Sequence, residues 1–186
     1  MKRMILCMLL FLFTSSAWAV DVEGVNVPDQ VVVEGKTLLL NGAGVRTKFF
    51  FDIYVGALYL EDSANRAETV LAKPSPARIS MDILYSEVDK EKLVKGWHAG
   101  FKKNQSKAAF AALKDRLDAF SAMFSDARQG DHLYFDFLTN GETHVVIKGQ
   151  QVGSIAGLDF QQALLAVWLG NKPADSDLKQ AMLKAK

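Results

Sequence analysis

One arginine stands where the sequence changes from a glycine-rich stretch to a long apolar segment. Arg46 follows Gly42 and Gly44, which we expect to form a tight bend because glycine adopts backbone angles closed to other residues. Residues 49–60 are rich in aromatic and β-branched side chains, which predicts a strand buried on both faces. Arg46 would then place a positive charge where apolar surface meets a polar edge. The same pattern suits an arginine that extends into solvent or pairs with a structural carboxylate, so both interpretations stay open.

The histidines are too far apart to share a metal ion. Asn140-Gly141 suits a two-residue type I′ turn, which would pair Phe137 with His144. His132 lies five residues before Phe137 in the sequence, so the two imidazoles would be about 17 Å apart. His98 follows a tryptophan on a lysine-rich helix, where we expect it to be exposed. We predict no metal site.

Other catalytic patterns are missing as well. The histidines show no spacing that indicates a Ser-His-Asp arrangement, and Gly42-Ala-Gly44 lacks the rest of a phosphate-binding loop. Asp52 and Asp136 fall on expected strands without a visible carboxylate partner, and we interpret them as surface or salt-bridged groups. We predict no cofactor.

Hydrophobic patterning predicts the elements that must position these residues. Strands are expected over residues 30–34, 36–40, 49–60, 78–85, 132–139 and 142–148. Helices are expected over residues 65–72, after the caps Asp89 and Ser106, and over residues 158–169 and 175–184. Antiparallel hairpins with helices grouped between them indicate an α+β layered domain.

The two central helices carry apolar stripes that we assign to the core. Leu93, Trp97 and Phe101 follow one another at helical spacing on the first helix. The second helix has the stripe Phe110, Leu113, Leu117, Phe120 and Phe124. We interpret the lysines of the first helix as a solvated face; they are Lys90, Lys92, Lys95, Lys102 and Lys103.

Two parts of the sequence resemble the chalcone isomerase family. Gly42-Ala-Gly-Val-Arg46, followed by Phe50 and Val55-Gly-Ala-Leu-Tyr-Leu60, resembles that family's strand pair. Val167-Trp-Leu-Gly-Asn-Lys-Pro173 with Leu178-Lys179 is similar to the C-terminal helices of bacterial chalcone isomerase-like proteins, and the resemblance extends over residues 21–184. It implies an open-faced β-sandwich, in which an antiparallel sheet carries a layer of helices, and it implies that Arg46 faces a ligand cleft.

The same resemblance shows a departure from the family's enzymes. Cyclisation of a hydroxychalcone needs a stabilised phenolate and stabilised charge on the enone oxygen, which several polar groups supply together. Arg46 matches the family's arginine, but Tyr54 occupies the place of the strand threonine. Asp89, Gly96 and Val167 occupy the places of the tyrosine, the asparagine and a late-helix hydroxyl. We therefore expect no useful chalcone cyclisation; if isomerase activity remains, Arg46 is its electrostatic centre.

An arginine combined with a tyrosine is similar to the fatty-acid-binding branch of the family. The resemblance implies that Arg46 and Tyr54 hold the carboxylate of a fatty acid or a similar amphipathic acid. A guanidinium binds a carboxylate through two parallel hydrogen bonds, and a phenol can donate a third. Phe49, Phe51 and Val55 are candidates for the wall around the tail, and filling the core is their alternative role.

Three classes of function stay open. The first is a binding or carrier protein for an amphipathic acid. The second is a structural or partner-interaction protein whose fold is filled and holds no ligand. The third is an intramolecular lyase of the chalcone isomerase type. Co-purified lipid separates the first from the second, and turnover of a chalcone identifies the third.

Length and charge exclude a nucleic-acid partner. Loss of residues 1–19 from the 186-residue chain leaves 167 residues, which suits one domain over residues 20–186. The 22 basic residues fall to 20 against 21 acidic ones, whereas nucleic-acid-binding proteins show a clear basic excess. No later apolar run reaches membrane-spanning length.

Residues 1–19 have the features of a secretory signal peptide. Lys2 and Arg3 precede a short apolar stretch, and Ala17-Trp18-Ala19 provides small residues at the cleavage site. Cleavage would remove Cys7, the one cysteine, and with it any disulfide or thiolate chemistry. We expect a periplasmic protein.

We predict that the exported protein begins at Val20, because Ala17 and Ala19 meet the small-residue requirement for cleavage. The intact mass of protein from the periplasmic fraction should correspond to residues 20–186. A full-length mass, or recovery from the membrane fraction alone, contradicts the prediction.

Overall fold

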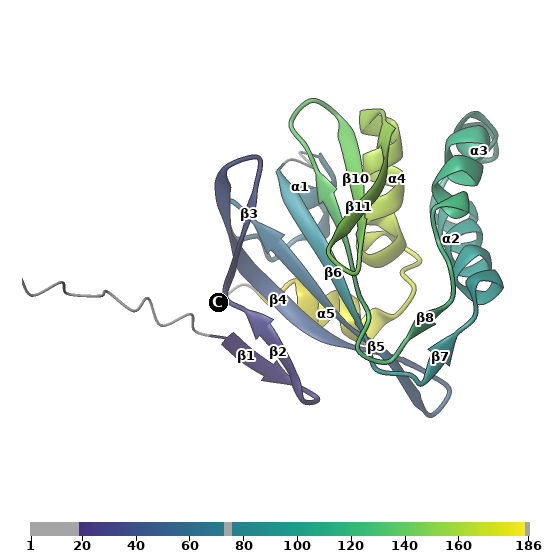
Figure 1. Cartoon of the computed structure of the whole chain (residues 1–186). Coiled ribbons are helices and arrows are strands. Elements are labelled where there is room, and N and C mark those ends of the chain that lie inside the picture. Colours follow the sequence, from purple (N-terminus) through teal and green to yellow (C-terminus); the bar gives the residue numbers. More distant parts are fainter. Residues whose placement is uncertain (1–18, 73–75, 185–186) are drawn as a thin grey trace, which may run out of the picture.

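The computed structural model describes residues 19–72 and 76–184, so the predicted signal peptide, apart from Ala19, lies outside the described residues. Seven antiparallel strands form one sheet in the order β11-β10-β9-β6-β5-β4-β3 (Figure 1). Their bounds are β3 Gln30–Val33, β4 Lys36–Lys48, β5 Phe51–Leu60, β6 Ala77–Ile83, β9 His132–Phe137, β10 Glu142–Ile147 and β11 Gln150–Ala156. Two short antiparallel pairs accompany the sheet: the hairpin of β1 Ala19–Val22 with β2 Val25–Pro28, and the pair of β7 Glu87–Val88 with β8 Ala127–Arg128, between which α2 and α3 lie in the chain.

Helices cover one face of this sheet (Figure 1). In the described part of the chain they are α1 Ala67–Ala72, α2 Lys90–Asn104, α3 Lys107–Ala122, α4 Leu158–Leu169 and α5 Ser176–Met182. The larger core lies between the helices and the sheet and is rich in aromatic rings. A smaller core lies on the opposite face and includes Val27 of the β1–β2 hairpin. The predicted α+β arrangement is therefore confirmed, with α4 at the predicted bounds.

Strand β5 lies inside the sheet between β6 and β4 and is buried on both faces from Tyr54 onward, as predicted. Tyr54 and Leu58 belong to the core under the helices, whereas Val55 and Tyr59 belong to the core on the opposite face. The strand begins at Phe51, because the chain turns at residues 49–50. Alternate side chains of β5 thus tie the two cores together through a single backbone.

The prediction of a bend at Gly42 and Gly44 was wrong, because both lie within β4. The role of these two glycines is to let α5 approach the strand closely. A Cβ on Gly42 would lie 2.1 Å from the carbonyl oxygen of Ala181, and one on Gly44 would lie 2.5 Å from the Cβ of Ala181. Gly56, the cross-strand partner of Gly44, likewise lies under α5. These glycines let α5 lie directly on the backbone of β4 and β5.

Asn41 fastens the end of α5 to the sheet. Its side-chain amide donates to the carbonyl oxygens of Met182 at 2.7 Å and Ala64 at 2.8 Å. Its amide oxygen accepts from the backbone N–H of Ala64 at 2.8 Å. This buried side chain therefore satisfies backbone groups from two other segments, which fixes where α5 lies.

The prediction of a two-residue hairpin turn at Asn140-Gly141 was also wrong, because the turn contains three residues. The N–H of Leu138 donates to the carbonyl of Glu142 at 2.9 Å, which leaves a three-residue connection with Gly141 at φ 88°. Phe137 consequently pairs with Thr143 instead of His144. A shift of one residue exchanges the faces of a strand, and the observed register is the one that buries Thr143 and Val145.

Gly42→Ala should lower the free energy of unfolding by about 1–3 kcal/mol, because the added methyl group overlaps the backbone of α5. Urea denaturation followed by tryptophan fluorescence measures the change. Gly96→Ala in α2 is the matched control, since a Cβ there meets nothing within 4 Å. It should stabilise the helix by about 0.5–1 kcal/mol. Equal stability of the Gly42→Ala variant and the wild type would contradict the assigned role.

Candidate ligand-binding site

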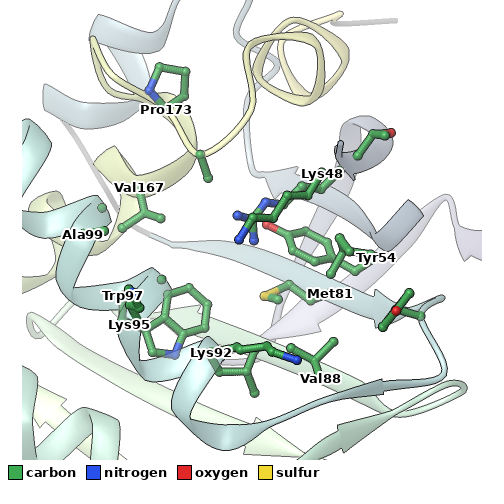
Figure 2. A pocket seen from close by; sticks show the side chains of 18 of the residues that line it. Lys48, Tyr54, Met81, Val88, Lys92, Lys95, Trp97, Ala99, Val167 and Pro173 are labelled. Atoms are coloured by element: carbon green, nitrogen blue, oxygen red, sulfur yellow. The ribbon is translucent and has the colours of Figure 1, made fainter. Parts of the chain in front are cut away.

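A cavity of about 530 Å³ opens between the sheet and α2 (Figure 2). Its walls come from one end of β4, β5 and β6, from β7 and α2, and from the segment that joins α4 to α5. The apolar part is lined by Ile53, Met81, Ile83, Tyr85, Leu93 and Val167. This volume lies within the roughly 300–1,000 Å³ usual for small-molecule sites.

The cavity lies where α5 stops covering the sheet. Arg46, Tyr54 and Ile83 form a row across β4, β5 and β6, just beyond Gly44 and Gly56. The side chain of Asp175 caps α5 by accepting from the N–H groups of residues 177 and 178, and it also accepts from the N–H of Thr47 at 3.2 Å. The start of α5 is therefore fixed beside Arg46, which leaves the row exposed to the cavity.

The opposite wall is held by α4. A Cβ on Gly100 of α2 would lie 2.9 Å from both methyl groups of Val167, so the two helices pack closely there. Asn104 of α2 donates to the carbonyl of Lys172 at 2.9 Å and accepts from its N–H at 2.9 Å. These contacts fix the segment after α4 as the third side of the cavity.

The structure brings the two predicted ligand-binding residues together at the cavity wall. Arg46 and Tyr54 are cross-strand partners, and the Cζ atom of Arg46 lies 5.5 Å from the centroid of the Tyr54 ring. Arg46 is half-buried, and its Nε atom is buried without a hydrogen-bond partner in the described part of the chain. None of the ion pairs between described residues includes Arg46. The interpretation that Arg46 pairs with a structural carboxylate therefore finds no support.

Tyr54 is oriented by a buried hydrogen bond. The indole Nε1–H of Trp168 donates to the phenol oxygen at 2.9 Å. Burial raises the pKa of Tyr54, and the charge of Arg46 and the bond from Trp168 offset only part of that rise. Tyr54 is therefore a neutral phenol at neutral pH whose own O–H can donate to a further acceptor.

Trp97 contributes a second polar group that sequence reasoning missed. Its ring belongs to the core, as predicted, and contacts Phe120, Phe124, Phe135 and Trp168 at centroid distances of 5.5–5.7 Å. Its Nε1–H is buried without a hydrogen-bond partner among the described residues, and the side chain lines the cavity. The signal was a residue with a polar atom in an otherwise apolar stripe, because a buried indole N–H usually has a partner.

The structure places none of the three candidate wall residues at the cavity, and of the two roles considered Val55 has the one in the core. Phe49 and Phe51 are exposed, and Val55 points to the core on the opposite face of the sheet. None of the three lines the cavity. Strand alternation separates Tyr54 from Val55, and the chain leaves the sheet at residue 49, so proximity in sequence to Arg46 did not mean proximity to the cavity.

Lysines surround the apolar interior. Lys92, Lys95 and Lys103 are exposed, as predicted for a solvated face, but they also border the cavity together with Lys48 and Lys172. Among the described lining residues, Glu87 is the single carboxylate, and it lies 3.4 Å from Arg128. The lining therefore carries more basic than acidic side chains, which favours an anion over a cation.

The positions that correspond to the family's enzymes carry no polar group toward the cavity. Gly96 and Val167 lie in the wall, where neither can position a phenolate. Asp89 is outside the lining residues; it precedes α2 and forms an ion pair with Lys92 at 2.7 Å.

The other candidate groups lie elsewhere. His132 contacts Asp82, and Asp136 is bound by Arg78 at 2.5 and 2.7 Å. Asp52 accepts a hydrogen bond from Thr47 at 2.8 Å. His98 is half-buried, not exposed as expected. Within residues 19–72 and 76–184, no group of three His, Cys, Asp or Glu side chains could hold a metal ion.

Comparison with known proteins identifies the family. Residues 19–184 match the family described as chalcone isomerase-like. The chain belongs to the chalcone isomerase-like family. A similar solved structure is that of a fatty-acid-binding protein of Arabidopsis thaliana, with a TM-score of 0.65 and 15% sequence identity over 87% of this chain and 92% of that one. At that identity the likeness shows the fold, and it confirms the predicted chalcone isomerase type of open-faced β-sandwich.

One further comparison and the lengths of the helices give negative results. No match was found among the curated proteins. In the described part of this chalcone isomerase-like protein, none of the helices is long and apolar enough to cross a membrane.

We predict that this chalcone isomerase-like protein loses stability as the pH rises above about 10, the usual tyrosine pKa. Burial raises the pKa of Tyr54 and of Tyr59 in the folded state. Their contribution to stability is complete below the unfolded pKa and is lost as the pH rises, because only the unfolded chain then releases the protons. Urea midpoints between pH 8 and pH 12 measure the loss, which should be smaller for Tyr54→Phe. If the urea midpoints of the wild type and of Tyr54→Phe changed identically with pH, this would contradict the buried, neutral state of Tyr54.

Proposed function

We propose that the protein binds a fatty acid or a similar amphipathic carboxylate in the cleft headed by Arg46, without catalysing a reaction on it. The observation that carries this proposal is the buried Nε atom of Arg46, which has no partner among the described residues and lies at the wall of an apolar cavity. The predicted signal peptide supports a periplasmic location for this binding.

The head-group chemistry follows from Arg46 and Tyr54. A buried polar group without a hydrogen bond is costly, and a guanidinium binds a carboxylate with two parallel, charge-assisted hydrogen bonds. Tyr54 lies beside that guanidinium as a neutral phenol and can donate a further bond. The lysines around the cavity add long-range attraction for an anion.

The tail would occupy the apolar part of the cavity. Ile53, Met81, Ile83 and Leu93 offer contacts without polar groups. Each methylene buried there contributes about 0.8 kcal/mol, so affinity should rise with chain length until the cavity is filled. Trp97 provides one unpartnered N–H on the facing wall for a polar atom of the ligand or a water molecule.

The alternatives fit the structure less well. A ligand-free protein with a filled fold is not supported by a cavity of about 530 Å³ beside an unpaired arginine. Isomerase activity would rest on Arg46 alone, because Gly96 and Val167 place no polar group in the wall. The similar Arabidopsis structure is described as a fatty-acid-binding protein, which supports the binding proposal.

Calorimetric titration of delipidated protein with a series of fatty acids tests the proposal. Arg46→Ala should cost about 2–3 kcal/mol of binding, the low end for a charge pair, because Arg46 is half-buried. Tyr54→Phe should cost about 0.5–1.5 kcal/mol, the value of one ordinary hydrogen bond. Arg66→Ala is the matched control, since this arginine is exposed and outside the lining residues.

The methyl esters of the same acids provide the decisive comparison. The ester keeps the tail and loses the charge, so it should bind the wild type more weakly than the acid does. Arg46→Ala should bind the ester and the acid with similar affinity. Equal affinity of acid and ester for the wild type would show that Arg46 is structural. Chalcone turnover that disappears in Arg46→Ala would favour the isomerase instead.

A further inference from the structure

Three consecutive phenylalanines are exposed at the turn between β4 and β5. Phe49, Phe50 and Phe51 are 82%, 96% and 55% exposed, and we call these three residues the phenylalanine tip. The turn projects from the lower edge of the molecule, beyond β7 (Figure 1). Water-exposed aromatic rings next to one another are unfavourable, and a contiguous apolar patch often marks an interaction site.

The turn itself does not account for these residues. Phe49 adopts a φ of 58°, in the left-handed region that glycine or asparagine normally occupies in a turn. The phenylalanine therefore adds backbone strain, and its ring gains little packing within the described chain. A sequence chosen for folding alone would place small polar residues here, which indicates that the rings contact something outside the molecule.

The size of the tip argues against a protein partner. A stable protein interface buries about 800 Å² on each side, drawn from roughly 20–30 residues, whereas the tip is one turn. A bilayer interface requires no such area, because aromatic rings insert singly or in small groups at the depth of the lipid head groups.

The charges beside the tip match an anionic lipid surface. Lys48 adjoins the tip, and Lys95 and Lys172 border the neighbouring cavity, where Lys92 is paired with Asp89. The nearest carboxylate in sequence, Asp52, accepts a hydrogen bond from Thr47. Glu87, which also borders the cavity, lies 3.4 Å from Arg128, whereas none of the ion pairs between described residues includes Lys48, Lys95 or Lys172. These three lysines therefore form a local excess of positive charge. Anionic lipids attract such clusters.

We propose that the phenylalanine tip inserts into the interface of an anionic lipid bilayer while the lysines around the cavity contact the head groups. The tip and the cavity are continuous. Phe51 packs edge-on against Tyr85, which lines the cavity, with ring centroids 5.5 Å apart. Thr47 and Lys48, which directly precede the tip, also line the cavity. Docking through the tip therefore turns the cavity toward the membrane. This surface goes beyond the proposed carboxylate binding and can be tested without any ligand.

Flotation of the purified exported protein with lipid vesicles tests the proposal. The wild type should bind vesicles that contain phosphatidylglycerol, and binding should weaken with salt and in pure phosphatidylcholine. Phe49→Ser/Phe50→Ser should lower the partition coefficient roughly tenfold or more, since two rings lose their apolar burial. The matched control is Val32→Ser/Leu158→Ser, which removes two exposed apolar residues from β3 and from the start of α4. It should bind like the wild type.

The tip variant also separates this proposal from the proposed function. Phe49 and Phe50 lie outside the lining of the cavity, so Phe49→Ser/Phe50→Ser should keep wild-type affinity for a soluble medium-chain fatty acid. Unchanged vesicle binding in this variant overturns the membrane role and leaves carboxylate binding untouched. Equal binding to anionic and neutral vesicles overturns the role of the lysines.

A fluorescent substitution locates the tip directly. Trp97 and Trp168 are buried, so the added emission of Phe50→Trp reports on the tip. The added emission should shift to shorter wavelength with anionic vesicles and be quenched by brominated lipids. No shift overturns insertion. A shift that appears without vesicles and grows with protein concentration overturns it in favour of contact between copies of the protein.

Discussion

Helix α5 lies on bare backbone, and the rest of the site depends on that contact. A helix normally stands off a sheet by the length of the side chains between them. Here Gly42, Gly44 and Gly56 remove those side chains, and Asn41 ties the end of the helix to the sheet. The helix therefore covers this strip without a gap. Beyond its first turn, the next row of the sheet carries Arg46 and Tyr54, and both of these residues line the cavity. The close packing of α5 on the glycines thus ends where the cavity begins.

The cavity determines the electrostatic environment of Arg46 and Tyr54. The Nε atom of Arg46 is buried without a hydrogen-bond partner, and none of the ion pairs between described residues includes Arg46. Tyr54 is held by Trp168 and stays protonated because burial disfavours the phenolate. Hydrogen-bond donors are thus preorganised around a point that lacks an acceptor. Such an arrangement suits an anion, which is the basis of the proposed function.

Some of the structure was predictable from local patterns. The apolar run of α4, the burial of β5 on both faces and the α+β class follow from periodicity, because burial on one or both faces imposes a period that the side chains must match. Arg46 and Tyr54 could be selected through the resemblance to relatives of the same fold. Their adjacency needed the β4–β5 pairing, which the structure supplies.

Other features depended on which segments meet in space. Glycine permits a bend and permits close approach equally well, and only the position of α5 decided that Gly42 and Gly44 serve the second purpose. The turn at residues 139–141 could hold two or three residues, and burial of Val145 against Phe135 decided the register. Trp97 could not be distinguished from other core residues by its position in the sequence. A cavity is a gap between elements, so the residues that line it show no periodicity of their own in the sequence. The sequence by itself determined which residues prefer to be buried. The tertiary structure alone decided which of them face a neighbour and which face an empty cavity, because that choice depends on distances between segments far apart in the chain.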